Sequence, residues 1–229
     1  MKIINQDIQV LNKIEELVEP SQTAIIVIDV QNAIISQVTS SDGSNIKSQL
    51  DVANVARVIP KIHDLLVVAR TIGMHIIYAE FIHRNRYGAS LMDGPSFYCV
   101  RNLPSVPDLI EGEWNAQTID ELAPQPGDLI ILKSRGSALH QTNLDNYLKT
   151  HSIRSLIITG LVMNGCVLMT AVDCVHHGYY PVVLSDCVSA YDLEWHELTL
   201  QWMKTQFPVF YSHDVFTVWG THKPLNKRY

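Results

Sequence analysis

Three reactive side chains follow apolar runs of the chain. Asp29 ends the run AIIVID, Lys133 ends LIILK, and Cys166 closes the stretch LIITGLVMNGC. A carboxylate, an ammonium group and a thiol together supply a base, a charge stabiliser and a nucleophile, which is the set that covalent acyl transfer requires. Taken singly, each has an ordinary structural interpretation, as a helix cap, a solvated strand end and a core thiol. Their shared position at strand ends favours chemistry.

The setting of Cys166 favours a reactive thiol. The segment Val167–Gly178 carries apolar residues at helical spacing and stops at a glycine, so Cys166 is expected to open a helix. The positive end of a helix dipole stabilises a thiolate, and we therefore expect a lowered thiol pKa. The alternative is a buried structural cysteine, which is common for this residue type. Cys174 and Cys187 are interpreted as core thiols.

The elements that must position these residues alternate along the chain. Five continuously apolar runs predict strands covered on both faces: Ala24–Asp29, His75–Glu80, Leu129–Lys133, Leu156–Thr159 and Val182–Ser185. Four helices are predicted around them: Pro60–Ile72, Thr142–Lys149, Cys166–His177 and Leu193–Thr205. This alternation predicts an α/β fold with a mainly parallel sheet and right-handed crossovers.

In such sheets the ligand crevice lies beyond the carboxyl ends of the strands. For Asp29 to touch Lys133, we expect the strands Ala24–Asp29 and Leu129–Lys133 to be neighbours. The strand Leu156–Thr159 is then expected on the far side of Leu129–Lys133, which brings Cys166 over both.

Composition narrows the class of protein. The 229 residues are 47% apolar and are interpreted as a single domain, 1–229, with an N-terminal helix at about 7–18 and a core at about 23–215. A net charge of -6 argues against nucleic acid and anionic membranes as partners, and no apolar run is long enough to span a bilayer. The four cysteines show no CxxC pair, so we expect reduced thiols and a cytoplasmic location.

One long segment, Phe81–Trp114, departs from the alternation of strands and helices. It is rich in Gly, Pro and aromatic residues, and a loop of this length in a compact domain is commonly functional. Its residues Arg84, Arg86 and Arg101 are candidates to clamp a substrate carboxylate, with surface arginines as an equal alternative. Trp114 and, outside the insert, Gln31 are further candidates for substrate binding.

Separated motifs carry a resemblance to a known family. They are IDVQNAI (28–34), LKSRGSAL (132–139), TNLDNYL (142–148) and ITGLVMNGCVLMTAVDCVHHGYYPVVLSD (158–186). In this order they resemble the isochorismatase-like cysteine hydrolases, which include nicotinamidases, N-carbamoylsarcosine amidases and ureidoacrylate amidohydrolases. The resemblance implies a three-layer α/β/α sandwich, a homo-oligomer (dimer or tetramer), and a catalytic set of Asp29, Lys133 and Cys166.

The resemblance also implies details of the site. It places a non-proline cis peptide at Leu161–Val162 and an oxyanion hole formed by the backbone N–H groups of Val162 and Cys166. Nicotinamidases carry a metal site after the second strand, built from an aspartate and two histidines. Here that stretch reads EFIHRNRYG with one histidine, so we expect no metal and no cofactor.

These features predict a metal-independent cysteine amidohydrolase that cleaves the C–N bond of a small amide or carbamoyl substrate through a thioester acyl-enzyme. Nicotinamidase, or another hydrolase activity of the family, is the alternative within the enzyme class. Isochorismatase proper lacks the nucleophile that Cys166 provides. A catalytically silent binding relative and a thiol redox protein are the rivals from other classes, and the missing CxxC weakens the redox interpretation.

Overall fold

The computed structural model describes residues 10–39, 52–95 and 108–221. Its centre is a six-stranded sheet in which every pair of neighbours is parallel, in the order β3-β2-β1-β4-β5-β6. The strands are β1 (Thr23–Ile28), β2 (His75–Phe81), β3 (Leu129–Lys133), β4 (Ser155–Leu161), β5 (Tyr180–Ser189) and β6 (Val209–Phe210). The predicted parallel sheet is confirmed.

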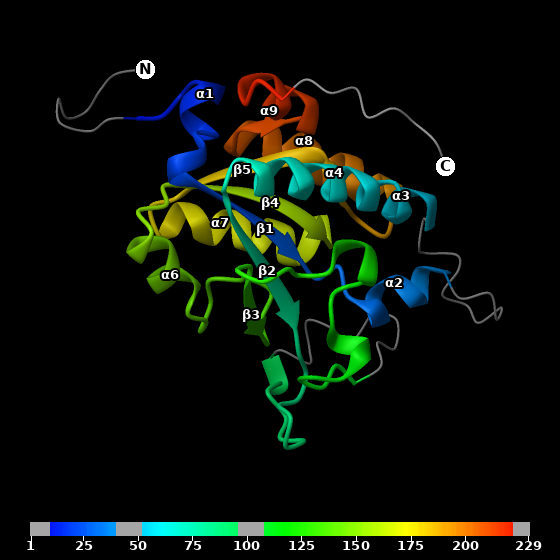
Figure 1. The fold of residues 1–229 in the computed structure, drawn as a ribbon. Helices are drawn as coiled ribbons and strands as arrows, with labels where there is room; N and C mark the ends of the chain where they lie inside the picture. Colours follow the sequence, from blue (N-terminus) through cyan, green and yellow to red (C-terminus); the bar gives the residue numbers. More distant parts are fainter. Residues whose placement is uncertain (1–9, 40–51, 96–107, 222–229) are drawn as a thin grey trace.

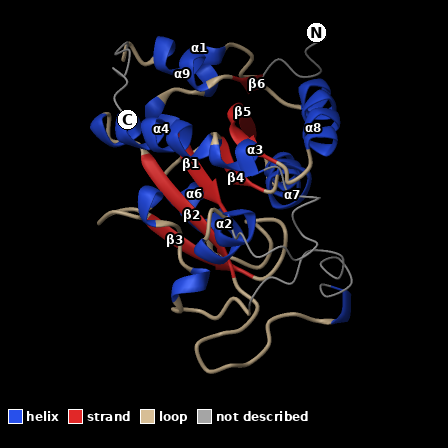
Figure 2. Ribbon diagram, turned by 90° about the vertical axis from the view of Figure 1, so that its right-hand side faces the viewer, coloured by secondary structure: helices blue, strands red, loops and turns tan. Residues whose placement is uncertain are grey.

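Helices cover both faces of the sheet and complete three layers (Figure 1). The helices are α1 (Ile14–Leu17), α2 (Asn32–Thr39), α3 (Val52–Ala56), α4 (Val58–Thr71), α6 (Leu144–Thr150), α7 (Leu168–His176), α8 (Leu193–Gln206) and α9 (Ser212–Val218). Side chains of α4 and α9 form one apolar cluster with the sheet, and those of α6, α7 and α8 form a second. Figure 2 shows the strands as the middle layer between these two sets.

The alternation of side chains along β1 divides the core between the layers. Ile25 and Val27 join the cluster beneath α4, whereas Ile26 and Ile28 join the cluster beneath α7. Successive side chains of a strand point to opposite faces, so a strand buried on both sides is apolar throughout. This is the reason that the continuously apolar runs predict central strands correctly.

The predicted neighbours of β3 are wrong. β2 lies between β1 and β3, and β4 pairs with the opposite side of β1 rather than with β3. β3 is therefore an edge strand, and its Ile130 and Leu132 are 48% and 37% exposed instead of covered. Apolar periodicity indicates burial, but it carries no information about which parallel strands pair.

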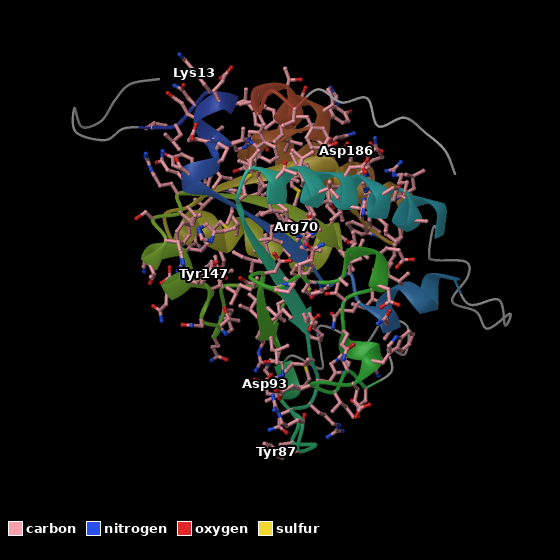
Figure 3. The ribbon with its side chains drawn as sticks, in the orientation of Figure 1. Lys13, Arg70, Tyr87, Asp93, Tyr147 and Asp186 are labelled. Atoms are coloured by element: carbon pink, nitrogen blue, oxygen red, sulfur yellow. The ribbon has the colours of Figure 1, made fainter. Side chains whose placement is uncertain are left out.

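Polar contacts join α4 to the sheet. Arg70 of α4 donates hydrogen bonds to the hydroxyl of Tyr78 in β2, at 3.0 Å, and to the carboxylate of Asp128, at 2.6 Å, just ahead of β3 (Figure 3). These bonds fix the amino-terminal half of β3 against β2. The carboxyl end of β3, which carries Lys133, is thereby held beside Phe81, its partner in register.

Several predictions about the ends of the chain differ from the structure. The described part of the predicted 7–18 helix is one short turn, α1, and residues 1–9 lie outside the described part. β5 has 10 residues and extends beyond the predicted Val182–Ser185 at both ends, and β6 is new. In the residues that the structure describes, no helix is long and apolar enough to cross a membrane.

Candidate active site

Asp29 and Lys133 form a buried ion pair at the carboxyl edge of the sheet. Nζ of Lys133 donates a hydrogen bond to Oδ2 of Asp29 at 2.8 Å, and both side chains are almost fully inaccessible to solvent. The ammonium group also donates to the carbonyl oxygen of Arg135 at 3.2 Å and lies 4.7 Å from the centre of the Phe81 ring. A buried charge requires such partners, because its hydration is lost.

The backbone of Asp29 turns the carboxylate away from β1. Its φ of 53° lies in the left-handed region, which aspartate tolerates better than most residues, and its N–H donates to the carbonyl of Ala79 at 3.0 Å. The second carboxylate oxygen, Oδ1, is buried and forms no conventional hydrogen bond with any group in the described part of the chain. Oδ1 is therefore available to accept a proton from a neighbouring group.

Gly160 allows β4 to approach β1 closely at this point. Its φ is +103°, and a Cβ atom placed there would lie 2.2 Å from the carbonyl oxygen of Ile28. Only glycine combines that backbone conformation with so close an approach. The residue after Ile28 is Asp29, so Gly160 brings the end of β4 against the carboxylate.

Cys166 lies in a tight turn between β4 and α7. The Leu161–Val162 peptide is cis, which confirms the expectation from the resemblance, and the carbonyl of Val162 accepts hydrogen bonds from the N–H groups of Gly165 and Val167. The carbonyl of Cys166 accepts from the Thr170 hydroxyl at 2.7 Å. Cys166 thus lies within the turn Met163–Val167, two residues ahead of α7, instead of forming the first residue of that helix.

The expected lowering of the thiol pKa is wrong for the free protein. Burial raises the pKa of Cys166 to about 12, and the negative charge of Asp29 adds to this effect, while the ammonium of Lys133 acts in the opposite direction. The residue as a whole is half-buried, and its thiol lies close enough to Asp29 and Lys133 for both charges to act on it. Burial and the carboxylate charge thus outweigh the charge of Lys133 and favour the protonated thiol over the thiolate.

The two charged partners respond to the same environment. Burial raises the pKa of Asp29, against the lowering effects of Lys133, of the Cys166 thiol and of the Phe81 backbone. Burial also acts to lower the pKa of Lys133, but Asp29 and Cys166 outweigh it and the pKa is raised. A carboxyl group of raised pKa beside a protonated thiol is suited to take and return a proton.

Gln31 and Glu80 form buried hydrogen bonds to the segments next to the ion pair. The Gln31 side chain is fully buried, and its amide donates to the carbonyls of Phe81 and Ala116 while accepting from the Phe81 N–H. Both the amide N–H and the amide oxygen of Gln31 are thereby occupied, so the residue holds the backbone at Phe81 and Ala116 in place. Glu80 accepts from the N–H and the hydroxyl of Thr118, both at 2.9 Å, and burial raises its pKa.

The arginines of the insert are already paired with carboxylates. Arg84 binds Asp108 at 2.6 Å, and Arg86 binds Glu111. These pairs fold the insert upon itself beyond the end of β2, with Tyr87 at its outer end (Figure 3). Trp114 is 62% exposed at the start of a short 3₁₀ turn. The structure does not bring Arg84, Arg86 or Trp114 into the contacts of the ion pair, and Arg101 lies outside the described residues.

The sequence indicates that Arg135 supports the site, and its carbonyl accepts a hydrogen bond from Lys133. Sequence reasoning missed two other contributors, the ring of Phe81 and the carboxylate of Glu80, which lie beside the ion pair. A carboxylate at the end of an apolar strand was a usable signal for Glu80, whereas a carbonyl contact has no sequence signature. No group of three or more His, Cys, Asp or Glu side chains that could hold a metal ion occurs within 10–39, 52–95 and 108–221.

An all-parallel α/β/α sandwich with a carboxylate, an ammonium and a thiol at one edge is the arrangement of a cysteine hydrolase. A family model described as the isochorismatase domain matches residues 23–214. The ureidoacrylate amidohydrolase RutB of Stutzerimonas stutzeri is 35% identical over 175 residues, which cover 72% of this chain and 69% of that protein. The chain belongs to the isochorismatase family.

Solved structures agree on the fold. A cysteine hydrolase from Pseudomonas syringae superposes with a TM-score of 0.73 at 24% identity, covering 89% of this chain and 95% of that one. An isochorismatase-like hydrolase from Alkaliphilus metalliredigens superposes with a TM-score of 0.69 at 26% identity, covering 86% and 99%. The expected fold class is therefore confirmed.

Proposed function

We propose that the protein is a cysteine amidohydrolase that cleaves a C–N bond of a small amide or carbamoyl compound through a thioester acyl-enzyme. The observation that carries the proposal is the buried Lys133–Asp29 pair, whose carboxylate and ammonium both act on the Cys166 thiol. Membership of a family with amidohydrolase and cysteine hydrolase relatives supports the same reaction class.

The first half of the reaction moves one proton and exchanges one bond. Asp29 takes the proton of the Cys166 thiol as the sulfur attacks the carbonyl carbon of the substrate. The C–S bond forms, the C–N bond breaks, and Asp29 returns the proton to the leaving nitrogen. Amine or ammonia departs and a thioester remains. The positive charge of Lys133 keeps Asp29 ionised before attack. It also offsets the negative charge that develops on the Cys166 sulfur as the thiol loses its proton.

The second half restores the enzyme. Asp29 takes a proton from water as the oxygen attacks the thioester carbon. The C–O bond forms, the C–S bond breaks, and the sulfur recovers its proton from Asp29. Because the resting thiol is protonated, the proton transfer to Asp29 accompanies attack instead of preceding it.

An oxyanion forms in both halves and requires hydrogen-bond donors. The backbone N–H groups of Val162 and Cys166 are the proposed donors, since the turn from Val162 to Val167 folds these two residues beside one another. Removal of one such donor in comparable sites costs roughly 3–4 kcal/mol of transition-state stabilisation.

The substrate is identified by ammonia release from a panel of compounds. Ureidoacrylate, N-carbamoyl amino acids, biuret, maleamate and nicotinamide cover the amide and carbamoyl chemistry, and the similarity to RutB is the reason to test ureidoacrylate first. We expect turnover of a carbamoyl compound by the wild-type protein and none by Cys166→Ala. Equal release by the two proteins would contradict the proposal.

Assembly and location follow as further expectations. Three large apolar side chains, Trp195, Leu198 and Trp202, are exposed on one side of α8. Exposed apolar patches mark interaction sites, which supports a homo-oligomer formed through this helix. Light scattering on the purified protein distinguishes a dimer or tetramer from a monomer, and cell fractionation tests the expected cytoplasmic location.

A further inference from the structure

β2 holds two distant parts of the chain at the carboxyl edge of the sheet. The carbonyl of Ala79 accepts a hydrogen bond from the N–H of Asp29 at 3.0 Å. In the next residue of the strand, Oε1 of Glu80 accepts from both the N–H and the hydroxyl of Thr118, each at 2.9 Å. The proposed reaction steps do not use the Glu80 carboxylate, although it is buried. Because a carboxylate is costly to bury, its place beside the ion pair calls for a function.

The segment that Glu80 holds crosses the residues that directly follow Asp29. We call residues 116–119 the crossing segment; it pairs with residues 30–32. The hydrogen bonds that join them run from the N–H of Ile119 to the carbonyl of Val30, from the N–H of Asn32 to the carbonyl of Gln117, and from the Gln31 side chain to the carbonyl of Ala116. Thr118 lies opposite Gln31 in this antiparallel pairing. Glu80 therefore binds the crossing segment at the middle of its contact with the chain that carries Asp29.

These contacts close a ring that contains Asp29. From Glu80 the ring runs through the crossing segment to residues 30–32, and from Asp29 it returns to Ala79, the residue before Glu80. Asp29 has a φ of 53°, in the left-handed region that few residues other than glycine adopt, and such a backbone persists only where its surroundings hold it. Glu80 and Thr118 are both buried, so water does not compete for their hydrogen bonds.

We propose that Glu80 is a positioning residue for Asp29: by holding Thr118 it keeps the crossing segment paired with residues 30–32, and so keeps the Asp29 carboxylate at the Cys166 thiol. The inference rests on the proposed function, in which Asp29 is the base, and deepens it by giving a role to a second buried carboxylate. A purely stabilising role for Glu80 is the alternative, in which its bonds hold the fold without affecting the chemistry.

Two substitutions of Glu80 separate these roles. Glu80→Met and Glu80→Gln have the same charge and a similar length, and only glutamine retains an oxygen that can accept from Thr118. We expect Glu80→Met to lower kcat about 10- to 100-fold with KM within about threefold of wild type, because a base displaced by about 1 Å reacts poorly. Glu80→Gln should keep kcat within about threefold of wild type. The substrate is the compound that the ammonia screen identifies, and kcat is counted per chain whose Cys166 reacts with iodoacetamide.

Asp186 provides the matched control. Its carboxylate also accepts from an N–H and a hydroxyl of one residue, Ser212, at 2.8 and 2.6 Å, but it joins β5 to the start of α9 (Figure 3). Asp186→Leu should lower the melting temperature and leave kcat within about twofold of wild type. Where Glu80→Met does not fold, Thr118→Val removes one of the two bonds and is expected to lower kcat about 3- to 10-fold.

Alkylation of Cys166 by iodomethane gives a readout that needs no substrate. Displacement of the Asp29 carboxylate takes negative charge away from the thiol, which favours the reactive thiolate. At one pH below the thiol pKa, we expect Glu80→Met to react about threefold or more faster than Glu80→Gln, with the buried Cys174 and Cys187 unlabelled in both.

Equal kcat values in the two Glu80 variants, or equal alkylation rates, would overturn the inference. A loss of kcat in Asp186→Leu as large as that in Glu80→Met would also overturn it, because any loss of stability would then have the same effect. Failure of the proposed function is distinguishable: Cys166→Ala would then release ammonia as fast as wild type, whereas the alkylation rates of the two Glu80 variants are compared without turnover.

Discussion

Lys133 contacts Asp29 from two strands away. β2 lies between their strands, and the lysine side chain passes over the Phe81 ring at its end to place Nζ 2.8 Å from the carboxylate. Two strand spacings amount to about 9–10 Å, which a lysine and an aspartate side chain span together. The ion pair therefore depends on the contact between Lys133 and the Phe81 ring as well as on the two charged residues.

Substitution of either partner shifts the thiol pKa, in opposite directions. Asp29→Asn removes the negative charge beside Cys166 and should lower its pKa from about 12, while turnover falls at least about 100-fold because the base is lost. Lys133→Met removes the positive charge and should raise the thiol pKa further. The measurement is the rate of Cys166 alkylation by iodomethane as a function of pH. A profile that neither substitution moves would show that the ion pair does not act on the thiol.

The pH dependence of turnover should report Asp29. Its pKa is raised by burial, so the acid limb of the kcat/KM profile is expected above the ordinary aspartate range near about 4. The raised pKa of Asp29 also makes the free energy of unfolding depend on pH, and the contribution of Asp29 falls as pH rises. The folded state binds the Asp29 proton more tightly than the unfolded state, so this contribution is full below the ordinary pKa and is lost as pH rises through the raised value. An acid limb at or below the ordinary range would exclude Asp29 as the base.

Substitution of Gly160 tests the close approach of β1 and β4, and substitution of Gly178 is its matched control. Both have positive φ, but a Cβ atom at Gly160 meets the Ile28 backbone, whereas at Gly178 it meets nothing within 4 Å. Gly160→Ala should lower the free energy of unfolding by more than about 3 kcal/mol, from strain and overlap together, and Gly178→Ala by about 1–2 kcal/mol, from strain alone. Urea denaturation measures both. Equal losses would show that the approach is not tight.

Chelation tests the expectation that catalysis needs no metal. Extended dialysis against a strong chelator should leave kcat within about twofold of the untreated value, since thiol, carboxylate and ammonium supply the whole reaction. Elemental analysis before and after dialysis is the control. A stoichiometric metal ion whose removal abolishes turnover, and whose return restores it, would contradict the expectation.

The sequence predicts which candidate residues meet better than it predicts the strand order that joins them. Asp29, Lys133 and Cys166 stand out because each follows an apolar run, and parallel strands carry such residues to one edge. The strand order was mistaken because pairing between buried parallel strands leaves no periodic trace. The thiol pKa was mistaken because a local rule about helix ends omits desolvation and the Asp29 charge, which come from distant segments.

The substrate contacts were the least predictable part of the site. Arg84 and Arg86 were chosen for their charge, but carboxylates 24 and 25 residues further along the chain neutralise them. Gln31 was chosen for its position after Asp29, yet its amide is occupied by the backbone of Phe81 and Ala116. Such pairings join segments far apart in sequence, so a side chain's type alone does not reveal them.

The central claim is that Cys166 forms a covalent thioester during turnover. The direct measurement is intact-mass spectrometry of protein quenched in acid during steady-state turnover, followed by peptide mapping. The account predicts an added mass equal to the acyl group on the peptide that contains Cys166, and none in Cys166→Ser or on the buried Cys174 and Cys187. Turnover at the wild-type rate by Cys166→Ser, or an acyl group found on another residue, would contradict it.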